Sequence, residues 1–102
     1  MLVYSVTVSL DEGVREAWLS WMRDDHIPAV MATGYFRSFE FLELLEPAPE
    51  PGTCTFNIQY RCPDQVSYET YLAREAPALR QDHENRFGQH FVAFRTLLRT
   101  VS

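Results

Sequence analysis

Long apolar runs, cysteine, glycine and positive charge are all scarce in this sequence of 102 residues. No apolar segment approaches the ~20 residues with which a helix spans a bilayer, so we expect no membrane partner. The first residues, MLVYSVTVSLDEG, lack a basic flank and soon turn acidic, which is unlike a signal peptide. These features predict a soluble cytoplasmic protein.

The scarcity of cysteine and glycine argues against a disulfide-stabilised protein and against a glycine-rich phosphate-binding protein. Cys54 and Cys62 fall eight residues apart in one segment with strand alternation. Eight strand residues span roughly 26 Å, which is beyond the reach of a disulfide. We therefore expect two reduced, buried thiols, with no nucleophile motif around either. The four glycines are dispersed, which leaves no glycine-rich phosphate-binding loop.

Positive charge comes from nine arginines and no lysine, against 14 acidic residues, giving a net charge of −5 at pH 7. This balance argues against a nucleic-acid partner. The 46% of hydrophobic residues is enough to build a core, and the length predicts a single domain over residues 1–102.

Periodicity predicts the order strand, helix, strand, strand, helix, strand. Residues 1–10 and 53–62 alternate as strands, and residues 35–46 and 90–101 are extended and rich in aromatic residues. Helices are predicted over Asp11–Thr33 and Asp64–Phe87, the second with Asp64 as N-cap and Gly88 at its end. The segment EPAPEPG predicts a hairpin connection. This order predicts an α+β, ferredoxin-like βαββαβ fold, with both helices on one face of a four-stranded antiparallel sheet.

The face of the sheet away from the helices is unusually poor in charge. Its predicted residues on the first and third strands are neutral hydroxyls and amides: Ser5, Thr7, Thr55, Asn57 and Gln59. The second and fourth strands carry apolar residues in both phases, which is typical of a sheet covered on both faces. We therefore predict a homodimer in which a second sheet covers this face; the alternative is a monomer with an open sheet.

Both predicted helices contain a proline. Pro28 cannot donate to the carbonyl of Asp24 and disfavours helical geometry at Ile27, so we expect the first helix to stop or kink near His26. Pro77 is expected to break the second helix in the same way. A kink would move each helix away from the sheet and open a pocket beside His26 and His83.

The segments WLSWM…HIPAVMATGYF, TFNIQY and APALRQDHENRFGQHFVAFRTLL resemble a bacterial family classified as domain of unknown function 4286. The segment from the tryptophans to HIP also looks like the first helix of the wider dimeric α+β-barrel group, particularly its ethyl-tert-butyl-ether-degradation type. The resemblance implies a homodimer whose sheets face each other. Members of that group include cofactor-free monooxygenases, isomerases, haem-handling enzymes and ligand binders. His26 and Pro28 occupy the His-x-Pro position of the group.

His26 is the candidate catalytic residue, because an imidazole that titrates near neutral pH can accept a proton from a bound molecule. The alternative is a structural role, in which the ring of His26 caps the carbonyls freed by Pro28. His83 shares a helix face with Leu79, Arg86 and Phe87. His83 and Arg86 are predicted to bind a carboxylate, or else are a buried histidine and a flanking surface arginine.

Four aromatic residues, Tyr4, Trp18, Trp21 and Tyr60, are predicted to line a pocket for a planar apolar ligand, or else to form ordinary core. No histidine pair has metal-binding spacing, and His90 is expected to point to solvent, so we predict no metal and no cofactor. The sequence favours a small-molecule-binding protein, either a cofactor-independent enzyme or a binding module. A non-catalytic interaction protein, and a haem protein with His83 as iron ligand, stay open as alternatives.

Overall fold

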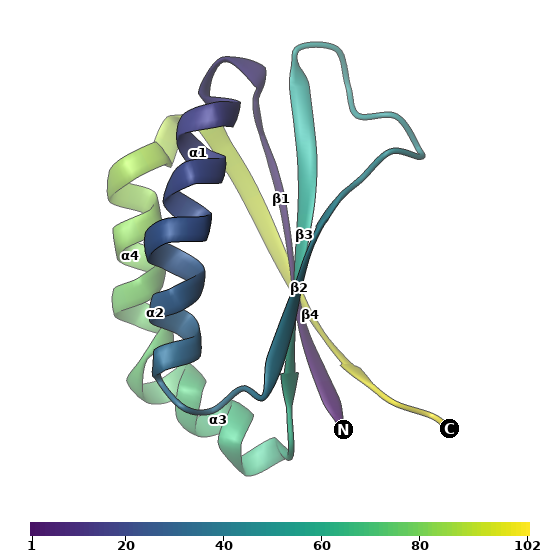
Figure 1. The fold of residues 1–102 in the computed structure, drawn as a ribbon, viewed down its shortest axis with the longest axis vertical. Coiled ribbons are helices and arrows are strands. Elements are labelled where there is room, and N and C mark those ends of the chain that lie inside the picture. The colour runs from purple at the N-terminus through teal and green to yellow at the C-terminus, as the bar shows by residue number, and fades with distance from the viewer.

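A computed structural model describes residues 1–102 as a four-stranded antiparallel sheet with helices on one face (Figure 1). The strands are β1 (Leu2–Asp11), β2 (Ser38–Glu43), β3 (Thr53–Cys62) and β4 (Phe91–Arg99). Their order in the sheet is β2-β3-β1-β4. The predicted ferredoxin-like α+β fold is thereby confirmed, with β1 and β3 at the centre and β2 and β4 at the edges.

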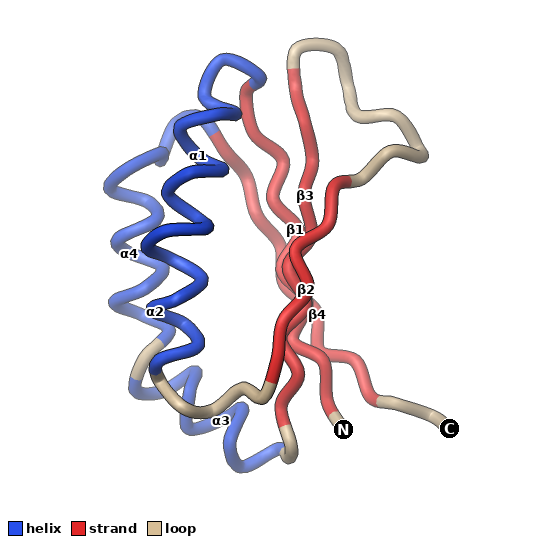
Figure 2. The backbone as a smooth tube through the Cα atoms, in the orientation of Figure 1, coloured by secondary structure: helices blue, strands red, loops and turns tan.

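The helices form one layer, which Figure 2 shows as a blue tube on one side of the red sheet. A 3-10 turn (Glu12–Val14) leads into α1 (Arg15–Trp21), a π-helical turn (Met22–His26) and α2 (Ile27–Ala32). The second half contains α3 (Gln65–Arg74), α4 (Ala76–Phe87) and a 3-10 turn (Gly88–His90). None of these helices combines the length and the apolar composition that a membrane span requires.

Register and alternation together decide which side chains face the helices. Tyr4 lies opposite Tyr60 on β3 and Leu97 on β4, and Val8 lies opposite Phe56. Because side chains alternate along a strand, the matching register places these residues on one face, where they contact the helices. Tyr4, Val8 and Tyr60 are almost fully buried there.

The first helix does not stop near His26, but its regular α-helical geometry is interrupted there by the π-helical turn between α1 and α2. Ile27 keeps helical dihedral angles, with φ −61° and ψ −44°, and its N–H donates to the carbonyl of Met22, five residues earlier. The wider π-helical turn absorbs the proline within a continuous helix. In Figure 1, α1 and α2 accordingly form one uninterrupted column.

The second helix breaks as predicted, at Glu75, two residues before Pro77. Glu75 leaves the helix with φ −114°, and Pro77 lies in the first turn of α4, a position where its missing N–H costs nothing. Asp64 is the N-cap of α3, because its side chain accepts a hydrogen bond of 2.8 Å from the N–H of Ser67. Figure 1 shows α3 and α4 running in different directions.

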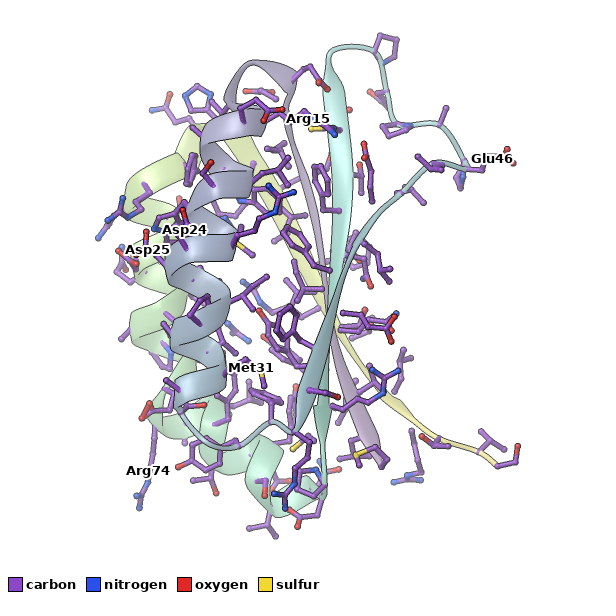
Figure 3. The ribbon with its side chains drawn as sticks, viewed as in Figure 1. Arg15, Asp24, Asp25, Met31, Glu46 and Arg74 are labelled. Atoms are coloured by element: carbon purple, nitrogen blue, oxygen red, sulfur yellow. The ribbon has the colours of Figure 1, made fainter.

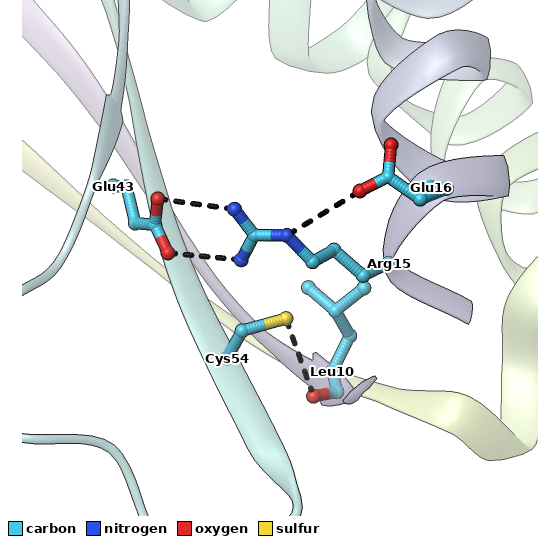
Figure 4. Close-up of polar contacts among 5 residues, drawn as sticks. All are labelled: Leu10, Arg15, Glu16, Glu43 and Cys54. Atoms are coloured by element: carbon cyan, nitrogen blue, oxygen red, sulfur yellow. Dashed lines mark hydrogen bonds and ion pairs between the residues drawn. The ribbon is translucent and has the colours of Figure 1, made fainter. Parts of the chain in front are cut away.

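An arginine joins the helical layer to an edge strand. The guanidinium of Arg15, at the start of α1, donates two hydrogen bonds to the carboxylate of Glu43 on β2, of 2.9 and 3.2 Å (Figure 4). Glu16 lies 3.6 Å from Nε of the same group. Cys54 lies nearby; it and Cys62 are buried free thiols, as predicted, and burial raises the pKa of both.

The sheet face away from the helices is covered by no other element (Figure 1). Its centre is polar, because the side-chain amide of Asn57 donates to the hydroxyls of Ser5 and Thr7 over 2.9 and 3.1 Å. Its β4 edge is apolar and open, with Phe94 63% and Leu98 49% exposed. We call this the outer face of the sheet.

Candidate functional site

A small cavity lies between the two layers, at the middle of the fold. Its volume is about 30 Å³, which is enough for a water molecule or a small chemical group. The sheet contributes the side chains of β1, β3 and β4, and the helices contribute those of the π-helical turn, α2, α3 and α4. The lining residues are Tyr4, Val6, Val8, Met22, His26, Val30, Ile58, Tyr60, Tyr71, Leu79, Arg80, His83 and Arg95.

Two histidines from different helices meet at this cavity. The ring centroids of His26, in the π-helical turn, and His83, in α4, are 5.5 Å apart. Trp21 lies against both, with ring centroids 4.8 Å from His26 and 5.4 Å from His83. Phe91 stacks on the ring of His83 at 3.9 Å. Aromatic rings therefore hold both imidazoles in place.

Hydrogen bonding differs between the two imidazoles. Nε2 of His83 accepts a hydrogen bond of 2.9 Å from the indole N–H of Trp18. The ring of His26 makes no hydrogen bond, and its Nδ1 is buried without a partner, as is the indole nitrogen of Trp21. His26 therefore does not cap the carbonyls near Pro28. A buried polar atom without a partner is rare in folded proteins.

Both histidines are held in the neutral form. Burial lowers the pKa of His26 to about 4, opposed by the charge of Asp82 and assisted by that of Arg95. Burial also lowers the pKa of His83 to about 3, assisted by the charge that His26 carries when protonated and by that of Arg95. Neutral imidazoles can accept a proton or a hydrogen bond, but they cannot act as cations for an anionic ligand.

The cavity adjoins a larger groove on the surface between α4 and β4. This groove has a volume of about 500 Å³ and is lined in part by Pro77, Glu84 and Phe91. Arg80 and Arg95 line both the cavity and the groove. We call these two residues the arginine pair.

The comparisons with known proteins agree with this fold. The model of the family described as Domain of unknown function (DUF4286) matches residues 1–101. The chain belongs to this family. No curated protein matches it.

Three solved structures are similar to this DUF4286 chain. An ethyl tert-butyl ether d (EthD) family protein from Bacillus halodurans has a TM-score of 0.69 and 14% identity, covering 99% of this chain and 100% of that one. HapK from Hahella chejuensis has a TM-score of 0.70 and 9% identity, covering 100% and 94%. A dimeric ferredoxin-like protein from an uncultured marine organism has a TM-score of 0.51 and 12% identity, covering 99% and 96%. At such low identity the likeness concerns the fold alone.

The predicted site residues of the DUF4286 chain fall into three groups. His26, His83, Tyr4 and Tyr60 line the cavity. Trp18 and Trp21 do not line it but lie behind the two histidines. Arg86 lies outside: its guanidinium stacks over the ring of Trp21 at 5.5 Å and pairs with Asp82 at 3.7 Å.

The arginine pair was missed by sequence reasoning. On β4, Arg95 shares the helix-facing phase with Phe91, Ala93 and Leu97. A charged residue in an otherwise apolar phase of a strand is the signal that would have found Arg95. For Arg80 the sequence offers no comparable signal, because it lies on a largely exposed helix.

The third histidine lies apart from the site. Nδ1 of His90 is 3.1 Å from the carboxylate of Asp11, and both side chains are exposed. No group of three or more histidine, cysteine, aspartate or glutamate side chains is arranged to hold a metal ion. Asp24 and Asp25, which precede His26, extend away from the sheet (Figure 3).

Proposed function

We propose that the protein is a homodimer that binds a small organic molecule at the cavity between its helices and its sheet, with one group of the ligand in the cavity, the remainder in the adjoining groove, and His26 as the group that acts on the ligand. The single observation that carries this proposal is the pair of neutral, closely spaced imidazoles at the cavity. His26 has a buried Nδ1 without a partner. A buried unpaired nitrogen costs about 1–3 kcal/mol, which favours a bound partner or a functional role.

Catalysis would consist of proton transfer without a cofactor. A neutral imidazole accepts a proton best when its pKa lies near the working pH. Burial is the main cause of the low pKa of His26, and the charge of Arg95 lowers it further. An anionic ligand that neutralises this charge would remove the contribution of Arg95 and raise the pKa of His26, so that ligand binding would make the imidazole a stronger base.

The outer face of the sheet supports the homodimer. Phe94, Leu98 and Leu42 are all more than 40% exposed there, and Oδ1 of Asn57 is buried without a partner. A second sheet would cover the apolar side chains and could donate to that oxygen. The same face supports the alternative of a non-catalytic interaction protein. The two free thiols favour a reducing compartment such as the cytoplasm.

The residues do not fit haem ligation by His83. Its Nε2 accepts the hydrogen bond of Trp18, and Phe91 covers one face of its ring. A histidine that ligates haem iron offers a free ring nitrogen to a wide pocket, whereas the cavity at His83 has about 30 Å³.

The test is ligand-induced thermal stabilisation against a panel of aromatic and carboxylate metabolites. Wild type is compared with His26→Gln and with the control His90→Gln, which alters the exposed histidine. We expect at least one metabolite to stabilise wild type and the control but not His26→Gln. Equal stabilisation of all three proteins would show that His26 does not contribute to ligand binding. The absence of stabilisation by any metabolite would favour the non-catalytic interaction protein.

A further inference from the structure

Arg95 differs from the other half-buried arginines in how its charge is balanced. Three of the nine arginines are half-buried: Arg15, Arg61 and Arg95. Arg15 pairs with Glu43 and Arg61 with Glu40, each over 2.9 Å. Arg95 forms no ion pair with any carboxylate of the chain. A partly buried guanidinium without a counter-ion is unfavourable unless a ligand supplies one.

The charge of Arg95 is directed at the cavity. Arg95 lies in the helix-facing phase of β4 and lines the cavity together with both histidines. Burial lowers the pKa of both histidines, and the charge of Arg95 lowers it further. The groove outside contains one carboxylate, Glu84, which pairs with neither arginine and lies beside Gly88.

Arg80 and Tyr4 line the same cavity as Arg95 and add two further hydrogen-bond donors. Nη2 of Arg80 donates to the hydroxyl oxygen of Tyr4 over 3.0 Å, which tethers this otherwise exposed arginine over the cavity. Because the Tyr4 oxygen accepts this bond, its own hydrogen is available to another acceptor. Two guanidinium groups and one hydroxyl donor, with no acid among them, match the acceptors of a carboxylate.

We propose that Arg95 and Arg80 form a carboxylate-binding subsite, and that the ligand is a small organic carboxylic acid in its ionised form. This inference rests on the proposed function, since it names the class of molecule that binds beside His26. The carboxylate lies at the boundary between cavity and groove, held by the arginine pair. One side of the molecule then faces the two histidines, and the groove of about 500 Å³ holds the remainder.

The experiment measures the affinity of matched acids and amides by tryptophan fluorescence. The chain has two tryptophans, and both lie against the histidines of the cavity, so their emission reports binding. The probes are propionate and phenylacetate, each with its neutral primary amide. The proteins are wild type, Arg95→Gln and the control Arg99→Gln, which alters an exposed arginine on the same strand that does not line the cavity.

We expect wild type and Arg99→Gln to bind at least one acid at least about tenfold more tightly than its amide, the ratio expected when a charge-assisted contact is lost. Arg95→Gln is expected to lose this preference while its affinity for the amide is unchanged. If Arg95→Gln fails to fold, Arg80→Gln replaces it, because the side chain of Arg80 is largely exposed.

Two results would overturn the inference, and they differ in what they leave standing. Equal affinity for acid and amide, or an unchanged preference in the arginine variants, removes the carboxylate subsite but leaves small-molecule binding at His26 intact. Absence of any response to acids and amides alike removes the subsite, and the metabolite panel then decides separately on the proposed function.

Discussion

The indole N–H of Trp18 donates to Nε2 of His83 over 2.9 Å, although the two residues are 65 positions apart in the chain. An indole nitrogen is a donor only, so Nε2 of His83 must be the acceptor and the ring proton must be on Nδ1. One hydrogen bond between the two halves of the chain therefore fixes the tautomer of a histidine at the cavity.

Trp18→Phe should allow His83 to populate both tautomers, because it removes the hydrogen bond to Nε2. We expect 15N NMR to show His83 of wild type with its proton on Nδ1, and a mixture of tautomers in Trp18→Phe. Because Nε2 of His83 loses its partner, the variant should also be about 1–3 kcal/mol less stable toward urea. Trp21→Phe is the matched control, since the indole nitrogen of Trp21 has no partner to lose. A proton on Nε2 in wild type would contradict the assignment.

The free energy of unfolding should fall as the pH decreases below about 6.5, the pKa of histidines in the unfolded chain. The folded protein keeps the pKa of His26 at about 4 and that of His83 at about 3. The unfolded state therefore binds more protons in this window, and each histidine costs up to about 1.4 kcal/mol per pH unit. Above about pH 6.5 both histidines are neutral in the folded and the unfolded state, so the folded protein has its full stability there.

Urea unfolding at a series of pH values between 7 and about 4.5 measures this slope. In His26→Gln the slope of the unfolding free energy against pH should fall by up to the amount that corresponds to one proton. In the control His90→Gln, which alters the exposed histidine, the slope should fall by less. The charges that face His26 are those of Asp82 and Arg95. An unchanged slope in His26→Gln would mean that His26 is not buried as a neutral ring.

Phe94→Glu should convert the proposed homodimer into a monomer. Phe94 is 63% exposed on the outer face of the sheet, and a buried, unpaired carboxylate at a subunit interface is strongly unfavourable. Val66→Glu is the control, because Val66 is also exposed, at 72%, but lies on α3. Light scattering after size exclusion measures the mass; a monomeric wild type at micromolar concentration would contradict the dimer.

Asp64→Ala should destabilise the fold by about 1 kcal/mol, which is typical for loss of an N-cap. The Asp64 side chain accepts from the N–H of Ser67 over 2.8 Å, and this hydrogen bond lowers the pKa of Asp64. Asp25→Ala, at an exposed position without such a bond, is the control in thermal unfolding. Equal effects of the two substitutions would show that the cap contributes nothing.

The fold could be predicted from the sequence because its signals are local. Alternation in residues 53–62 and the cap at Asp64 each depend on neighbours in the chain, and both are confirmed. The sequence left open whether the first helix would stop or kink near His26, because proline is compatible with either a break or a wide turn. The choice between them depends on tertiary contacts of the helix, such as the stacking of Trp21 on His26.

The candidate site was predictable only in part. Histidines on apolar helix faces pointed to His26 and His83, and strand phase pointed to Tyr4 and Tyr60. Arg86 shares a helix face with His83, yet it stacks on Trp21 outside the cavity. Arg80 reaches the cavity from the same helix because its long side chain bonds to Tyr4, 76 positions away. Sequence spacing carries no information about a contact of that range.

The π-helical turn at Met22–His26 has a consequence for alignments of this helix. A turn of this kind contains one residue more than an α-helical turn, so every later position is displaced by one relative to an uninterrupted helix. An alignment that permits gaps only in loops would then match His26 of this chain with the wrong neighbour in any relative whose helix is regular. Pairing the two correctly requires a one-residue gap inside the helix.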